Sequence, residues 1–576
     1  TKKAIGVYAK NATGTIKNTG KISGTGLKES MGIVAEGSTI TNEGEVDVEG
    51  TGVVGLVAKG AGATLKSEGA NSKIKATGNS SAAVYTDNGT VTLKGGSVDA
   101  EGGAIDLYSN NNGTINVSDS GTATAINTGQ KSLAFMTANG GKINFASATT
   151  ATIQGGATAP DRGTAFYYTP SGLTVTPGTA STYGSFSNLG TDLGTAFNNT
   201  LNNLKLDMQN GSRLMIASNI NASLTNTTDA SIRAALPGLR INGTDYKTAM
   251  LYLSYLNVDK NVNLDNATDD YNKLEISNSS VENNSTMTGT QAGQVAIAQE
   301  NIYNNPFNIN WVTLTNNGTI NLSGANSTAM YAKSGIIKNT NDITVGDSST
   351  GIYGTDNSQI SNTGVITIGS DSTGMYYDDA RNSTTTTTGM TNNGTIRSAG
   401  NNSVGMSYNH IGSNATTFEN AGTIELTGDK NTGMYAAGDP GYDAKNSGTI
   451  KLGNSASLNN PNVALYTNDT TNTTKLINTG TIESGANTIG IFGNKSENSG
   501  NITVGDGAIA IYSQQGNVDL TGGTIKLGGN EAVGVYTVGS GQTVTNSGTD
   551  FDIADTSYGF VNVGSGNTIN STKPNL

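Results

Sequence analysis

The sequence lacks cysteine altogether, and it contains only 8 prolines and one histidine, His410, in 576 residues. The absence of cysteine excludes a disulfide scaffold, cysteine-based metal sites and a thiol nucleophile. A single histidine leaves almost nothing from which to build a Ser-His-Asp triad or a histidine metal site. We therefore expect no catalytic residue, no cofactor and no metal.

Long apolar runs and positive charge are also scarce. No segment has the 18 or more apolar residues of a membrane-spanning helix. The net charge of −12 argues against a nucleic-acid partner, which requires basic stripes. No signal-peptide pattern follows Thr1, so we expect an interior fragment of a larger protein.

What the sequence has instead is glycine, at 78 residues, together with abundant Asn, Thr and Ser. One motif recurs, consisting of a small residue, an apolar residue and usually Tyr, about every 20–31 residues, which is a solenoid period. Examples are Gly6-Val7-Tyr8, Ala83-Val84-Tyr85, Ala329-Met330-Tyr331, Gly374-Met375-Tyr376, Ala464-Leu465-Tyr466 and Gly534-Val535-Tyr536.

A second motif, Asn-x-Gly-x-Ile, runs in phase with the first, as at Asn362 to Ile366 and Asn446 to Ile450. A third apolar point lies between the two motifs, so each period holds three short strands separated by turns of Gly and Asn, which tolerate positive φ. Three strands in about twenty-five residues are typical of one coil of a parallel β-helix, and crossover chirality favours the right-handed form. We therefore predict an all-β, right-handed parallel β-helix of about seventeen coils, in which equivalent side chains stack and turn asparagines form amide ladders.

The repeat disappears in the middle of the chain. This gap predicts β-helix coils over 1–167, an inserted α+β subdomain over 168–310 and further coils over 311–576. Apolar residues from Leu189 to Met208 have helical spacing, and Asp229 to Leu236 is a second helix candidate that ends before Pro237. Arginines, including Arg213, enrich this region in residue types common at binding sites.

The longest later loops leave their coils at the same point, so they are expected to stack along one edge of the β-helix. Loops on a rigid scaffold often carry binding residues. The predicted ridge contains Tyr377, Asp378, Asp379, Arg381, Tyr408, His410, Asp439, Tyr442 and Asp443. An acidic ridge with tyrosines suits a cationic partner, or a sugar packed on aromatic faces. The alternative is that these residues are only solvated turns.

The in-phase Thr-Gly-Met-Tyr and Asn-x-Gly-Thr-Ile repeats, as at Thr373 to Tyr376 and Asn392 to Ile396, resemble those of the large autotransporter adhesins of Fusobacterium. The resemblance covers nearly the whole chain. It implies a monomeric passenger displayed outside the outer membrane, with a C-terminal translocator barrel that is missing from this sequence. Arginine-inhibitable and galactose-binding members are both compatible with the repeat.

Three functions follow from these observations. The first is an adhesin that binds proteins or glycans on partner bacteria or host cells. The second is a purely structural stalk of a larger adhesin. The third is a β-helical polysaccharide-degrading enzyme, which would need a basic cleft for an acidic glycan, and the sequence offers no cluster of Lys or Arg for one.

Overall fold

Short strands joined by corners rich in Gly and Asn account for most of the chain. A computed structural model is all-β, with 58% strand and 3% helix, and its parallel sheets form a β-solenoid of about 19 turns. The structure describes residues 3–168, 184–186, 201–224, 228–299, 312–356, 358–379, 389–410, 417–437, 442–469 and 473–573. Each coil contributes one strand to each of three sheets, which confirms the predicted parallel β-helix with three strands per coil. Among the described residues, no helix combines the length and the hydrophobicity that a membrane span needs.

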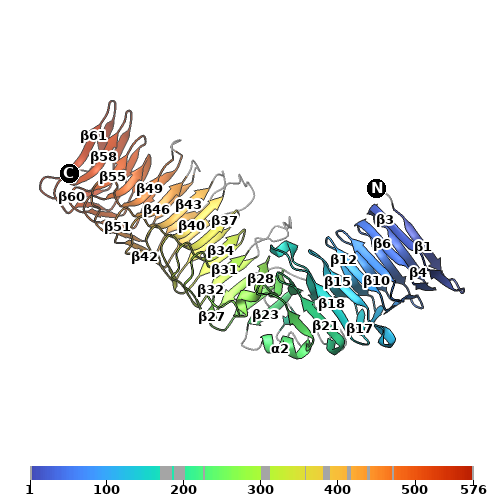
Figure 1. Cartoon of the computed structure of the whole chain (residues 1–576). Coiled ribbons are helices and arrows are strands. Elements are labelled where there is room, and N and C mark those ends of the chain that lie inside the picture. Colours follow the sequence, from blue (N-terminus) through green and yellow to red (C-terminus); the bar gives the residue numbers. More distant parts are fainter. Residues whose placement is uncertain are drawn as a thin grey trace. The chain divides into compact units, whose positions relative to one another are not determined.

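The chain forms two compact units (Figure 1). Unit 1 comprises residues 1–257, 267–279 and 301–305, and unit 2 comprises residues 258–266, 280–300 and 306–576. In unit 1, every third strand pairs in parallel with the next. Sheet 1a has ten strands, from β1 (Ile5–Lys10) to β28 (Leu274–Ser277); sheet 1b has six, from β2 (Ile16–Asn18) to β17 (Lys142–Phe145); and sheet 1c has eight, from β3 (Lys21–Lys28) to β24 (Leu239–Ile241).

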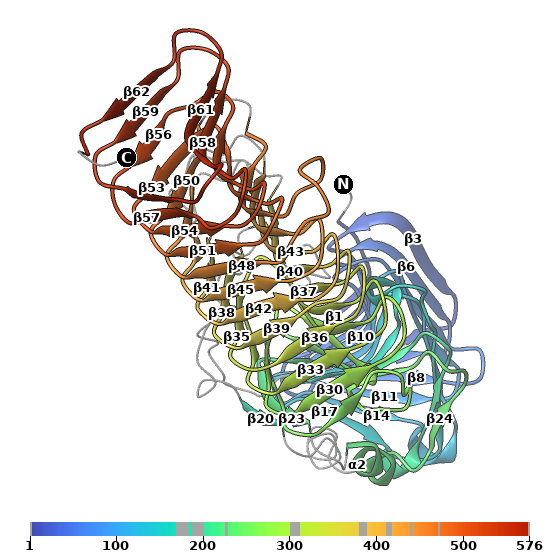
Figure 2. The ribbon, with the colours of Figure 1, turned by 90° about the vertical axis from the view of Figure 1, so that its left-hand side faces the viewer.

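Unit 2 repeats this arrangement. Sheet 2a has eleven strands, from β31 (Val295–Gln299) to β61 (Tyr558–Val563), and sheet 2c has twelve, from β27 (Val262–Asn263) to β60 (Asp550–Ile553). Sheet 2b in this unit takes every third strand from β29 (Ser280–Asn283) to β62 (Thr568–Ser571). Figure 2 shows strands of sheet 2c, such as β33 (Thr319–Leu322) and β48 (Thr449–Leu452), as rungs of one ladder.

The small-apolar-Tyr motif has a steric cause in sheet 2a. In the pairing of β34 (Thr328–Lys333) with β37 (Thr350–Thr355), Met330 lies opposite Ile352 and Tyr331 opposite Tyr353. The small residue before Met330 and the one before Ile352 are skipped in this register. The skipped residue and the next one both face the interior, so the first must be small. A Cβ atom on Gly351 would lie 2.5 Å from the carbonyl oxygen of Gly374. The Tyr that follows points outward and is half-buried.

Buried asparagines form the predicted amide ladder along sheet 2b. In each link, Nδ2 of one Asn donates to Oδ1 of the Asn one coil further on, over 2.7–2.8 Å. The second N–H group is satisfied within the turn, as where Asn362 Nδ2 donates to the carbonyl of Gly364 at 3.1 Å. Because these buried amides are hydrogen-bonded, they stabilise the corner instead of carrying a desolvation cost. The members are Asn283, Asn316, Asn339, Asn362, Asn392, Asn420, Asn446, Asn478 and Asn498.

The predicted inserted subdomain at 168–310 is wrong over the described residues. β21 (Leu204–Met208) pairs with β18 (Thr149–Ile153), and β22 (Arg213–Ser218) pairs with β19 (Thr164–Tyr168), so coil stacking continues where the motif is absent. Further coils follow through β25 (Lys247–Tyr252), which pairs with β22. The division between the units falls near residues 258–280, not at the two predicted boundaries.

One of the two predicted helices is confirmed in this region. Helix α2 (Thr228–Ala235) ends just before Pro237, as expected. The other prediction is wrong at its end, because residues 204–208 form a strand; residues 187–200 lie outside the described residues. Leu204, Leu206 and Met208 alternate inward on β21, and this period of two was hidden within the helical spacing of the longer segment.

Candidate binding surfaces

The predicted ridge tyrosines lie inside the solenoid, so their expected exposure is wrong. Tyr377 and Tyr408 are 0% exposed and Tyr442 is 5% exposed. Tyr377 lies on β40 (Thr373–Asp379) and Tyr408 on β43 (Val404–His410). Each follows an outward residue directly, so the alternation of the strand turns it inward. The rings of Tyr377 and Tyr408 stack with centroids 4.6 Å apart, and Tyr442 Oη donates to the carbonyl of Tyr408 at 2.6 Å. Burial raises the pKa of Tyr442 well above its ordinary value.

Only part of the acidic ridge remains on the surface. Asp378 is half-buried and accepts a hydrogen bond from Asn409 Nδ2 at 2.8 Å, and Asp443 is exposed at the start of β47 (Asp443–Asn446). Asp379 and His410 are paired in backbone register. Arg381 and Asp439 lie outside the described residues.

Tyr376, the outward neighbour of the buried Tyr377, lies close to Asp378. Burial, and then the nearby Asp378 carboxylate, raise the pKa of Tyr376 to about 12. The phenol therefore stays neutral well above pH 7 and adds no charge to the ridge.

An apolar groove that the sequence reasoning missed lies on the outer face of sheet 2a. It covers β49 (Val463–Thr467), β52 (Ile489–Gly493), β55 (Ile509–Ser513) and β58 (Val533–Val538). One row of outward side chains is aromatic, with successive ring centroids 5.3, 4.9 and 5.2 Å apart: Tyr466, Phe492, Tyr512 and Tyr536. The neighbouring row is aliphatic: Val463, Ile489, Ile509 and Val533. We call these two rows and their rim the aromatic groove.

The aliphatic row distinguishes this part of sheet 2a from the coils before it. The equivalent outward position is Thr in most earlier strands, as at Thr328, Thr350, Thr373 and Thr432, and it is Val only singly, at Val295 and Val404. A loop with Pro461 and with Leu458, which is 41% exposed, forms one wall, and the groove has a volume of about 680 Å³. A coil-by-coil comparison of the residue three places before each outward aromatic residue would have found it, because four successive coils carry Val or Ile there.

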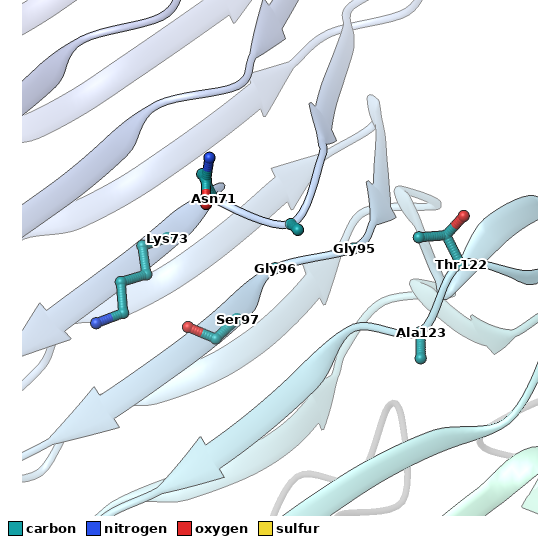
Figure 3. A pocket seen from close by; sticks show the side chains of 8 residues that line it. Asn71, Lys73, Gly95, Gly96, Ser97, Thr122 and Ala123 are labelled. Carbon is teal, nitrogen blue, oxygen red and sulfur yellow. The ribbon is translucent and has the colours of Figure 1, made fainter.

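A polar hollow lies at the corner between sheets 1b and 1c in unit 1. The chain crosses this corner at Gly95 and Gly96, between β11 (Thr90–Lys94) and β12 (Ser97–Glu101). The same corner takes four residues, 69–72, in the preceding coil and seven, 118–124, in the following one. The short crossing between two longer ones leaves a recess, which we call the glycine notch. Figure 3 shows Gly95 and Gly96 between Asn71 on one side and Thr122 and Ala123 on the other.

The glycine notch is polar and has two adjoining parts of about 490 and 420 Å³ that share Ala70, Asn71 and Thr122. Lys73 and Ser97 line one part, and Glu68 and Lys94 line the other. Both crossing glycines have positive φ, and a Cβ atom on Gly96 would lie 1.9 Å from the carbonyl oxygen of Ser72. Glycine is therefore required for so short a corner.

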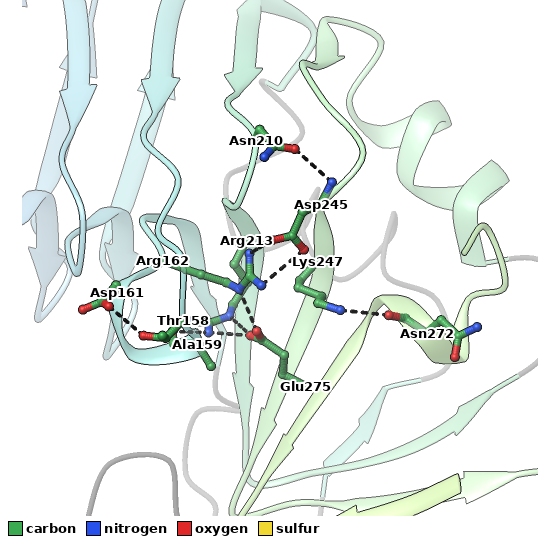
Figure 4. Close-up of polar contacts among 10 residues, drawn as sticks. All are labelled: Thr158, Ala159, Asp161, Arg162, Asn210, Arg213, Asp245, Lys247, Asn272 and Glu275. Atoms are coloured by element: carbon green, nitrogen blue, oxygen red, sulfur yellow. Dashed lines mark hydrogen bonds and ion pairs between the residues drawn. The ribbon is translucent and has the colours of Figure 1, made fainter. Parts of the chain in front are cut away.

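Unit 1 also contains a buried ion network in which two arginines converge on one carboxylate (Figure 4). Arg162 Nε donates to Glu275 Oε1 at 2.8 Å, and Arg213 Nε donates to Glu275 Oε2 at 2.6 Å. Arg162 also forms a two-pronged pair with Asp245, over 2.9 and 3.2 Å. Arg213 is 1% exposed, so this predicted binding-prone residue packs inside the fold. The network joins its segments and leaves no charge free for a ligand.

Acid–base chemistry has few places to occur in the described residues. No group of three or more His, Cys, Asp and Glu side chains there could hold a metal ion. Asp106 is fully buried on β13 (Ile105–Asn110), where it accepts a hydrogen bond from Thr128 Oγ1 at 2.6 Å, and burial raises its pKa well above the ordinary value. This carboxyl group faces the coil interior, out of reach of a substrate.

Comparison with protein-family models, with curated proteins and with solved structures finds no match for the chain.

Proposed function

We propose that this chain is the binding shaft of an adhesin that is displayed on a bacterial surface and attaches its cell to partner bacteria or host cells, without catalysis. The observation that carries the proposal is the aromatic groove. Contiguous apolar surface on an otherwise polar protein marks interaction sites, and aromatic residues are enriched at the centres of interfaces.

The aliphatic side chains lie on the outer face of sheet 2a, where Val463, Ile489 and Ile509 are 8%, 4% and 9% exposed. Ile489 and Ile509 pack against Phe492 and Tyr512 and form a ledge beside the rings. The ledge itself is already largely buried, so a partner would remove from water the apolar area of the half-buried rings and of exposed Leu458, at about 25 cal/mol per Å². Repetition on stacked coils holds the rows in fixed positions, which lowers the entropy cost of binding.

The orientation of the rings favours a protein partner over a sugar at this groove. Phe492 and Tyr512 stack with their planes 7° apart, and Tyr512 and Tyr536 with theirs 16° apart. These three rings therefore cover one another's faces and turn their edges outward, whereas the Tyr466 ring is tilted by 54° from Phe492. A sugar stacks on an aromatic face, whereas apolar side chains of a protein pack well against edges and aliphatic groups.

The test restores the upstream pattern. A purified fragment with Ile489→Thr, Ile509→Thr and Val533→Thr should bind at least tenfold fewer partner cells in flow cytometry than the native fragment, across a panel of bacterial and epithelial cells. A matched control with Thr423→Val, Thr449→Val and Thr481→Val changes as many β-branched residues on the outer face of sheet 2c and should bind normally. Equal binding by both variants would remove the groove from the proposal, and no binding of the native fragment to any cell would favour the stalk.

A further inference from the structure

We propose that the glycine notch of unit 1 is a subsite for a carboxylated sugar, of the uronic-acid type, within a cell-surface glycan. This inference rests on the proposed adhesive function, because it names a second ligand class for the same shaft. It is carried by the shape of the recess, by one lysine in each part that forms no ion pair with a described residue, and by the hydrogen-bonding groups beside these lysines.

The recess is a built feature of the corner. The two-residue crossing at Gly95 and Gly96 is held by the preceding coil, where Ser97 N donates to the carbonyl of Ser72 at 3.0 Å. It is also held by the following coil, where Gly95 N donates to Thr124 Oγ1 at 3.2 Å. The longer corners on either side form its walls. The two parts, of about 490 and 420 Å³, are within the size range of small-ligand sites.

The lysines at the notch differ from several others on unit 1, which form ion pairs between coils. Lys17, Lys21 and Lys75 each pair with a carboxylate one coil further on, over 2.7–3.0 Å. Within the described residues, neither Lys73 nor Lys94 has a carboxylate within ion-pair distance. Their ammonium groups are therefore available to an anion at this corner of a protein whose net charge is −12.

The other polar groups fit the hydroxyls of a sugar. Glu68, opposite Lys94 in register, offers carboxylate oxygens that accept hydrogen bonds, and the Asn71 amide both donates and accepts. Glu43 at the edge is already neutralised by Lys17 at 2.7 Å, so it does not repel an anion strongly. Each part of the notch thus presents one lysine for a carboxylate, with neutral or acidic acceptors for hydroxyls. A phosphate or sulfate would make less use of these acceptors.

Calorimetry with trigalacturonate and its methyl ester tests the inference on the whole chain. The native protein should bind trigalacturonate, and binding to the ester, which keeps the sugar and loses the charge, should be at least tenfold weaker. Lys73→Gln with Lys94→Gln should weaken binding at least tenfold. Ala123→Trp, which fills the notch from an exposed wall position without changing charge, should also weaken it. A control with Lys59→Gln and Lys142→Gln removes two exposed lysines away from the notch and should leave affinity unchanged.

Three results would overturn the inference: no binding of trigalacturonate, equal binding of the ester, or equal loss in the control lysine variant. Its failure can be separated from failure of the proposed function. If cells bind through the aromatic groove but trigalacturonate does not bind, the notch assignment is wrong and adhesion stands. If the fragment adheres to no cell, the adhesive function is wrong whatever the notch binds.

Discussion

The two units build the same corner in different ways. In unit 2 the corner between sheets 2b and 2c is held by a continuous ladder of buried asparagines, and most crossings take two residues. In unit 1 the ladder stops early. Asn18 donates to Asn42, Asn42 donates to Ser67 Oγ, and the column continues with the apolar residues Leu93, Val117 and Phe145.

The difference shows what a side-chain ladder does to the surface. An Asn at every coil fixes the turn that follows it, because its amide is bonded both to the next coil and to the turn. An apolar column leaves the turn free to vary, and in unit 1 the crossings range from two to seven residues. The glycine notch is one result of that variation. Unit 2, with uniform corners, carries its candidate site on a sheet face instead.

The largest effect expected from a single change is in the buried ion network of unit 1. Glu275→Gln removes the carboxylate shared by Arg162 and Arg213 and leaves two buried cations with weaker partners. Removing one partner of a buried ion pair costs about 3–5 kcal/mol. Urea denaturation should show this loss in unit 1, whereas the exposed Glu425→Gln in unit 2 should change stability little. A loss below 1 kcal/mol would mean that the network contributes little to holding unit 1.

The next effect compares the two corner designs directly. Asn420→Ala leaves Nδ2 of Asn392 without its acceptor and Oδ1 of Asn446 without its donor, both in the buried ladder. Each unsatisfied buried group costs about 1–3 kcal/mol, so we expect a total loss of about 2–3 kcal/mol. Asn18→Ala, at the half-buried start of the short ladder in unit 1, should cost less than about 1 kcal/mol in the same denaturation experiment. Equal losses would show that the ladder is not cooperative.

A smaller effect depends on pH in unit 1. Asp106 occupies a position that holds Ala83 and Ala134 in the adjacent coils, and Asp106→Ala should stabilise the protein at pH 7 by about 1–2 kcal/mol. The pKa of Asp106 is raised in the folded state, so only the unfolded state ionises as pH rises above about 3.9, and native stability falls there. The advantage of the variant should therefore vanish below that pH. Thermal unfolding from pH 3 to pH 7 measures it, and an advantage that does not depend on pH would contradict the assignment.

The smallest effect concerns the surface ion pairs of unit 1. Lys75→Ala removes the pair with Glu101, whose Nζ and Oε2 atoms lie 2.8 Å apart and whose side chains are more than one-third exposed. Such pairs contribute about 0.2–1 kcal/mol and are screened by salt. Thermal unfolding should show a small loss at low salt that disappears at high salt. A loss that persists in salt would mean that the lysine acts through packing.

The fold was largely predictable because most coils repeat the same steric and hydrogen-bonding requirements in their sequence. At the positions of Gly351 and Met375, most coils carry a small residue followed by an apolar one, because both positions face the interior. At the position of Asn362, a buried amide bonds both to the next coil and to its own turn. Where the repeat degenerates, the prediction failed. Leu204, Leu206 and Met208 satisfy the helical and the strand pattern alike, and only pairing with β18 decides between them.

The candidate sites were harder to predict, for two physical reasons. Tyr377 and Tyr408 look like loop residues, but they occupy the inward strand position that Gly354 and Ala436 hold in neighbouring coils. A shift of one position on a strand exchanges exposed for buried. The glycine notch depends on differences in length between neighbouring corners, which become visible only once the strands of all three coils are in register. A single coil, read alone, contains neither signal.

The central claim is that partners dock in the aromatic groove. Because the chain has no cysteine, a single cysteine can be introduced and modified at a chosen position to test it. Leu458→Cys at the groove rim and Glu425→Cys on sheet 2c each give one site for a bulky polyethylene glycol maleimide. Both modified fragments keep the coil core intact, so their cell binding can be compared directly. We predict that modification at Leu458 abolishes binding and modification at Glu425 does not. Equal binding by the two modified fragments would contradict the account.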